Sequence, residues 1–121
     1  MHQVIISLAS NKEAKKNLSE ARRCLGQILD EMSFSECIRT RAIGTQRICY
    51  YHNQLLFAST TLSVDELVCR LKAIEQQMGR TAEDRQQGIV CIDLDLLKYD
   101  EQRYHLCDWE RPYVQRLLPQ S

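Results

Sequence analysis

The sequence is poor in the residues that usually mark linkers and chain breaks, since its 121 residues include 4 glycines and 2 prolines. We therefore expect a single domain over residues 1–121, without a linker. An excess of one charge is also missing, because 16 basic residues balance 16 acidic residues and the formal net charge is +0. This balance argues against a broad basic surface for nucleic acid or an anionic membrane, so any bound anion must be held locally.

Long hydrophobic runs are absent as well. No apolar segment approaches the roughly 20 residues that span a bilayer, and the chain opens on a strand-like segment, Gln3 to Leu8, in place of a signal peptide. We expect a cytoplasmic protein with no membrane partner. The six cysteines contain no C-x-x-C pair, so we interpret them as reduced core thiols and not as a metal site or a disulfide framework.

The hydrophobic pattern of the first half predicts a strand, a helix and two further strands. Val4 to Leu8 is a short β-rich run, and apolar residues recur at helical spacing from about Lys12 to Met32. Strand-like patterns follow over Ser35 to Ile43 and over Tyr51 to Thr61. The polar segment Gly44-Thr45-Gln46 separates these two predicted strands.

The second half begins with a helix signal. Ser63 and Glu66 have the spacing of a capping box, and Gly79 is expected to end the helix that starts there. A last strand is predicted over Gly88 to Leu97. The element order is therefore β-α-β-β-α-β, which is typical of a ferredoxin-like α+β fold with an antiparallel sheet and two helices on one face. Many unrelated activities use that fold, so function must be argued from a site.

The last predicted strand carries two carboxylates separated by one apolar residue. Because alternate residues of a strand share a face, Asp93 and Asp95 should lie roughly 6 to 7 Å apart on the same side. Like charges at that distance repel unless a cation lies between them, and Mg²⁺ carrying a polyphosphate suits such a pair. The alternative is that both residues simply form the solvated side of an amphipathic strand.

Four segments, read in chain order, carry a family resemblance. They are Ala9-Ser10-Asn11, Tyr51-His52-Asn53, Ile74 to Arg80 and Val90 to Leu97. Together they resemble the hydroxymethyldihydropterin pyrophosphokinase (HPPK) family, and the likeness covers nearly the whole chain as a divergent and shortened member. The resemblance implies a folate-pathway enzyme that moves a diphosphate from ATP to a pterin alcohol with the help of Mg²⁺.

The resemblance also implies roles for individual residues. Tyr51 and Tyr113 match the two aromatic rings that sandwich the pterin, and Asn53 matches the amide that hydrogen-bonds its edge. Asp93 and Asp95 match the two Mg²⁺ carboxylates. The same tyrosines could instead be ordinary half-buried aromatic residues, and the asparagine a polar residue of a turn or strand edge.

On the nucleotide side the resemblance implies fewer retained residues. Glu75 matches a nucleotide-side acid, and Arg80 and Arg111 are the catalytic cations expected to hold the phosphates. Val90 stands where the family has a phosphate-binding arginine, and the family's histidine motif before Arg111 is missing. Two alternatives therefore stay open: a non-catalytic relative that binds pterin and nucleotide, and a ferredoxin-like subunit that associates through a sheet edge.

Overall fold

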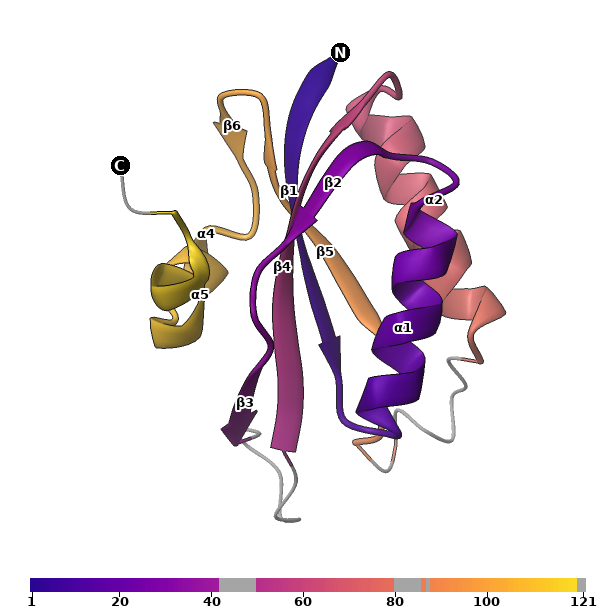
Figure 1. The fold of residues 1–121 in the computed structure, drawn as a ribbon, viewed down its shortest axis with the longest axis vertical. Coiled ribbons are helices and arrows are strands. Elements are labelled where there is room, and N and C mark those ends of the chain that lie inside the picture. The colour runs from indigo at the N-terminus through magenta and orange to yellow at the C-terminus, as the bar shows by residue number, and fades with distance from the viewer. Residues whose placement is uncertain (42–49, 80–85, 87, 120–121) are drawn as a thin grey trace.

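The computed structural model describes residues 1–41, 50–79, 86 and 88–119. Its architecture is a single antiparallel sheet with helices on both faces (Figure 1). In chain order the elements are β1 (His2–Ser10), α1 (Ala14–Leu25), β2 (Asp30–Phe34), β3 (Ile38–Arg41), β4 (Tyr50–Thr60), α2 (Val64–Gln77), β5 (Asp93–Tyr99), β6 (Gln102–Arg103), α4 (Leu106–Trp109) and α5 (Pro112–Leu117).

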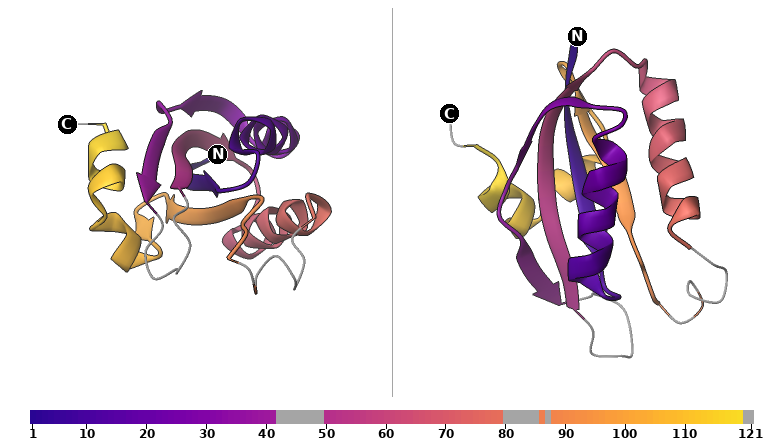
Figure 2. Two further views of the ribbon diagram at one scale, coloured as in Figure 1. Left: turned by 90° about the horizontal axis from the view of Figure 1, so that it is seen from below. Right: turned by 45° about the vertical axis from the view of Figure 1, so that its right-hand side comes forward.

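The six strands of the sheet run in the order β2-β4-β1-β5-β6, and β3 also pairs with β4. Every strand pair is antiparallel. Helices α1 and α2 lie side by side on one face, and α4 and α5 lie on the opposite face (Figure 2). The expected ferredoxin-like α+β fold is thus confirmed, with β1 at its centre between β4 and β5.

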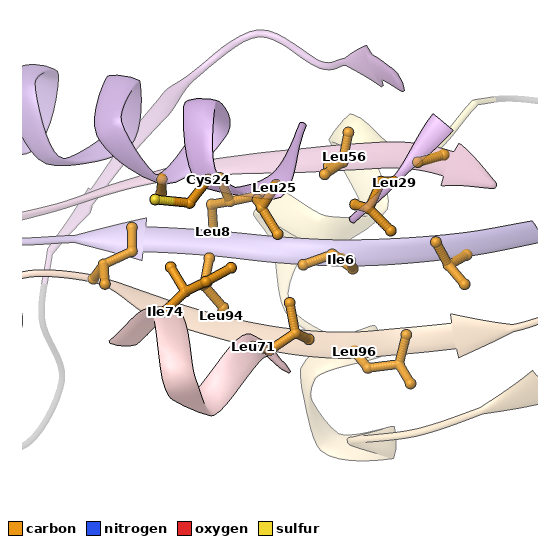
Figure 3. Close-up of a cluster of buried hydrophobic side chains, with 14 of the residues drawn as sticks. Ile6, Leu8, Cys24, Leu25, Leu29, Leu56, Leu71, Ile74, Leu94 and Leu96 are labelled. Atoms are coloured by element: carbon orange, nitrogen blue, oxygen red, sulfur yellow. The ribbon is translucent and has the colours of Figure 1, made fainter. Parts of the chain in front are cut away.

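The main hydrophobic core lies between the sheet and helices α1 and α2 (Figure 3). Alternate residues of β1 point into it, since Ile6 and Leu8 are 0% exposed. They pack with Leu25 of α1 and Leu71 of α2, and with Leu94 of β5. Full burial of each such side chain contributes about 1.5 to 3 kcal/mol to folding. The other residues of β1 therefore face the opposite side of the sheet.

A second, smaller hydrophobic cluster covers part of that opposite face. It joins Leu55 of β4 and Leu97 of β5 to Trp109, Val114 and Leu117 of the C-terminal helices. The indole Nε1 of Trp109 donates to the carbonyl oxygens of Leu97 and Tyr104 at 3.2 and 3.0 Å. These contacts anchor α4 and α5 to the sheet.

The helix predicted from Lys12 to Met32 is shorter than expected. Helix α1 ends at Leu25 with Gly26 as its C-cap, and strand β2 begins at Asp30. Ile28 and Met32 still pack against the main core. These apolar residues belong to a turn and a strand, but their spacing in the sequence is the same as on one face of a helix. The predicted break at Gly44-Thr45-Gln46 lies outside the described residues.

The second predicted helix begins as the sequence indicated. Ser63 Oγ accepts a hydrogen bond from the Glu66 backbone N–H at 3.2 Å, and the Glu66 carboxylate accepts from the Ser63 backbone N–H at 3.4 Å. The α2 helix ends at Gln77, shortly before Gly79, whose φ of +95° suits a residue without a side chain. None of the helices in the described part of the chain is long and apolar enough to cross a membrane.

Only some of the described cysteines lie in the core. Cys24 and Cys91 are buried as expected. Cys37, Cys69 and Cys107 are exposed, so the prediction that all of the cysteines are core residues is wrong for these three.

Candidate functional site

The candidate site is a hollow on the face of the sheet that carries α4 and α5. Two residues of the central strand that point to this face, Ser7 and Ala9, are small. In the strand register Ser7 lies opposite Asp95, while Ala9 lies opposite Asp93 on one side and Asn53 on the other. Because their side chains are small, larger neighbours surround an open space above β1.

This pocket has a volume of about 250 Å³, which is slightly below the ~300 to 1,000 Å³ of ordinary ligand sites. It therefore suits a small ligand. Residues from four strands and the C-terminal helical segment line it: Ser7, Ala9, Thr40, Tyr51, Asn53, Asp93, Asp95, Asp108, Arg111 and Tyr113.

Six of the eight site residues predicted from the sequence line this one pocket. They are Tyr51, Asn53, Asp93, Asp95, Arg111 and Tyr113. Glu75 lies elsewhere, along a second hollow beside α2. Arg80 lies outside the described residues.

Asn53 is held in one orientation at the floor of the pocket, where it is 3% exposed. Its Nδ2 donates to the Ile38 carbonyl oxygen at 3.0 Å and to Thr40 Oγ1 at 2.8 Å. Both partners belong to β3, which the sequence did not connect to the site. Since Nδ2 is engaged in this way, Asn53 offers a ligand its Oδ1 acceptor. The amide thus selects a ligand edge that donates a hydrogen bond.

Tyr51 and Tyr113 reach the pocket from different layers. Tyr51 lies on β4 and pairs with Thr40 of β3. Tyr113 is the second residue of α5, directly after Pro112 at the start of that helix. Burial raises the pKa of Tyr113, so its hydroxyl stays protonated at neutral pH. Both rings are half-buried and line the pocket.

Asp93 and Asp95 point to the same face of β5, as the strand period predicted. Burial raises the pKa of Asp95 to about 7, and the nearby charges of Asp93, Asp108 and Glu75 act in the same direction. Burial and neighbouring negative charge therefore favour the protonated form of Asp95. A bound cation would relieve that repulsion.

Asp108 and Arg111 form an ion pair at the rim of the pocket. Arg111 Nε donates to Asp108 Oδ1 at 3.0 Å. Among the described residues that line the pocket, Arg111 is the only cation. Sequence reasoning missed Asp108, although its position three residues before Arg111 is a spacing at which helical side chains meet.

The second hollow, of about 350 Å³, lies along the outer edge of β5, beside α2. Its wall is partly apolar, through Val68 and Leu71. Lys72 and His105 also line it. Asp93 and Asp95 line both hollows, so the two spaces meet at the carboxylates.

Glu75 and His105 approach the carboxylates from this second side. Glu75 is 6% exposed, and its Oε2 accepts a hydrogen bond from the Leu94 backbone N–H at 2.8 Å. His105 Nε2 lies 3.8 Å from Asp95 Oδ1. No motif in the sequence connects His105 with a partner, so only the fold brings it to the site.

The carboxylate pair fits a magnesium ion. Within the described residues there is no group of three or more His, Cys, Asp or Glu side chains arranged to hold a metal. A dedicated Zn²⁺ or Ca²⁺ cage usually needs more protein ligands than two, whereas Mg²⁺ commonly takes one or two carboxylates and completes its shell with water and substrate phosphates. The close, repelling carboxylates of Asp93 and Asp95 meet that requirement.

Two comparisons with known proteins give matches to this chain. The family model for 7,8-dihydro-6-hydroxymethylpterin-pyrophosphokinase (HPPK) matches residues 5–120. A folate synthesis bifunctional protein of Arabidopsis thaliana is 29% identical over 122 residues, covering 93% of this chain and 25% of the plant protein. The chain thus spans about a quarter of the length of that relative.

Proposed function

This chain belongs to the 7,8-dihydro-6-hydroxymethylpterin-pyrophosphokinase (HPPK) family of the folate pathway, and from that premise we propose that it transfers a diphosphate from Mg-ATP to a pterin alcohol. The observation that carries the proposal is the convergence of two tyrosines, one oriented amide and two paired carboxylates on one pocket. These groups come from segments that are distant in the sequence. Such a combination suits a flat, hydrogen-bonding heterocycle next to a phosphate chain.

The pterin would occupy the 250 Å³ pocket above Ser7 and Ala9. Tyr51 and Tyr113 would flank its ring faces, where each stacked pair contributes about 0.5 to 1.5 kcal/mol beyond burial. Asn53 Oδ1 would accept a hydrogen bond from the heterocycle, since β3 holds the amide nitrogen. One fixed amide between two aromatic rings would give the bound heterocycle its orientation.

ATP would occupy the second hollow, along the outer edge of β5. Val68 and Leu71 supply an apolar wall for the base, and Lys72 and His105 are cations or donors that can face phosphate oxygens. Glu75 remains the proposed acid of this nucleotide side. Because the carboxylates border both hollows, the phosphate chain would reach the pterin across Asp93 and Asp95.

In the reaction, the hydroxymethyl group of the pterin would lose its proton to solvent, and its oxygen would form a bond to the β-phosphorus of ATP. The bond from that phosphorus to the oxygen bridging to the α-phosphate would break, and AMP would leave. Asp93 and Asp95 would hold Mg²⁺, which when bound neutralises charge on the phosphates. Arg111 would exchange its Asp108 partner for phosphate oxygens, and Arg80 is proposed as a second cation. The protein would act mainly by positioning the two substrates.

A second candidate is a relative that binds pterin and nucleotide without catalysing transfer. Val90 favours it, because this half-buried aliphatic residue stands where the family resemblance implies an arginine. Its backbone is fixed at both ends, since Val90 N–H donates to Asn11 Oδ1 at 2.6 Å and the Val90 carbonyl accepts from Asn11 N–H at 2.9 Å. Loss of one phosphate-binding group costs about 3 kcal/mol of transition-state stabilisation, or roughly a hundredfold in rate.

The test is ATP-dependent AMP formation with hydroxymethyldihydropterin, together with calorimetric binding of each substrate. Pterin-dependent AMP formation is the expected result. Saturable binding of both ligands without AMP would favour the non-catalytic relative, and absence of pterin binding would contradict both functions. Tyr51→Ala should abolish or weaken pterin binding, whereas Tyr50→Ala changes the exposed neighbouring ring and should leave binding unchanged.

A further inference from the structure

The outer edge of β5 is covered by a strand at only one end. Strand β6 pairs with Lys98 and Tyr99. Within the described part of the chain no strand pairs with the outer edge of β5 at Leu94. A buried backbone N–H at such an edge needs another acceptor, because an unpaired buried donor is strongly unfavourable.

Glu75 supplies that acceptor. Its Oε2 lies 2.8 Å from the Leu94 nitrogen in a buried hydrogen bond between α2 and β5. Leu71 and Ile74 pack in the main core and fix the helix above the sheet. Because α2 is anchored in this way, the carboxylate fixes the position of the β5 backbone at Leu94 relative to the helix.

A carboxylate at this position brings a further negative charge close to the paired aspartates. Among the described residues, Glu75 is the only buried charged residue, at 6% exposure. Its charge is one of the causes that raise the pKa of Asp95. A hydrophobic side chain would avoid that repulsion. What it would not provide is an acceptor for the Leu94 N–H.

Leu94 lies between the two carboxylates of the site. Its side chain points into the core, and those of Asp93 and Asp95 point to the pocket face. We propose that Glu75 is a positioning residue: by binding the Leu94 N–H it fixes the section of β5 from which Asp93 and Asp95 present their oxygens to a divalent cation. This inference rests on the proposed function, because that function assigns the cation to these carboxylates.

Two substitutions separate the acceptor of Glu75 from its charge. Glu75→Gln keeps a carbonyl oxygen that can accept from Leu94 and removes the charge. Glu75→Met keeps a similar length and removes the acceptor. Gln76→Met is the matched control, because it places the same side chain at an exposed neighbouring position of α2. Melting temperatures of all variants establish that each is folded.

The first readout is hydrogen exchange of the Leu94 amide, followed by NMR. The second is the affinity for Mn²⁺, measured by electron paramagnetic resonance in place of Mg²⁺. In Glu75→Met we expect exchange about tenfold faster and Mn²⁺ affinity about tenfold weaker, as for other groups that orient metal ligands. Glu75→Gln and Gln76→Met should stay within about threefold of the wild-type protein in both measurements.

Three results would overturn the inference. They are wild-type Mn²⁺ affinity in Glu75→Met, equal losses in the Gln and Met variants at position 75, and absence of Mn²⁺ binding by the wild-type protein. Equal losses would mean that the charge of Glu75 acts on the cation directly. A wild-type protein that binds Mn²⁺ but neither ATP nor pterin would instead contradict the proposed function and leave the comparison of variants valid.

Discussion

Replacement of Asp95 by asparagine should stabilise the metal-free protein at neutral pH. The pKa of this carboxyl rises from 3.8 to about 7 on folding, first through burial and then through Asp93. Between these two values the folded state binds more protons than the unfolded state. Stability therefore falls as pH rises through this window, and the loss is complete above pH 7. An asparagine side chain does not titrate, so the Asp95→Asn variant should lack this pH dependence.

The size of the effect follows from the pKa difference. A change from 3.8 to about 7 corresponds to about 4 kcal/mol for a fully shielded carboxylate. Since the side chain is 29% exposed, solvent screening should reduce this to ~2 kcal/mol. For a domain of this size we expect the Asp95→Asn variant to melt about 6 to 8 °C higher at pH 8 and at nearly the wild-type temperature at pH 4.

The assay is thermal denaturation at several pH values in EDTA, followed by the fluorescence of Trp109, the one tryptophan of the sequence. Asp100→Asn is the control, because the pKa of Asp100 shifts in the opposite direction: a hydrogen bond with His2 lowers it. That variant should gain no stability at pH 8. A lower melting temperature for Asp95→Asn at pH 8 would refute the reasoning and mark Asp95 as a structural residue.

Three further changes test the ligand site and the scaffold. Tyr113→Ala should weaken pterin binding by roughly 1 kcal/mol or more, measured by calorimetry with Mg²⁺ and a non-hydrolysable ATP analogue. Val90→Arg should raise diphosphoryl transfer by about one to two orders of magnitude, since a guanidinium can share phosphate charge; unchanged activity in a stably folded variant would reject that explanation. Ser63→Ala should lower the free energy of unfolding by about 1 kcal/mol in urea denaturation, and pterin affinity should not change with it.

Much of the fold could be predicted because its signals are local. The capping box at Ser63, the β-rich run in β1 and the alternation of Asp93 and Asp95 in β5 depend on neighbouring residues alone. The end of α1 could not be predicted in this way. Ile28 and Met32 continue the helical spacing, and only the pairing of β2 with β4 makes their segment a turn and a strand.

Local sequence patterns did not predict the C-terminal helices either. Helices α4 and α5 span 4 and 6 residues, and helices this short depend on tertiary packing. Their packing comes from Trp109 and Val114 against a sheet that forms from distant segments. Asp108 and His105 were missed for the same reason, because their approach to the site depends on where these helices lie.

Some of the site residues could likewise be predicted from local patterns, and others could not. Strand parity placed Asp93 with Asp95, and Tyr51 with Asn53, on shared faces. The expectation that Tyr113 would join them came from the family resemblance, since no local pattern connects α5 with β4. The role of Thr40 in orienting Asn53 required the register of β3 against β4.

The small residues of the central strand have a consequence for engineering this protein. Ser7 and Ala9 sit on the most central strand, where a designer seeking higher thermal stability would normally place large aliphatic side chains. Ala9→Leu would add apolar volume at about 0.8 kcal/mol per buried methylene group and would fill the pocket with the protein's own atoms. Stability screens run without ligand would therefore favour variants that have lost the binding site, whereas screens run with pterin and Mg-ATP present would retain it.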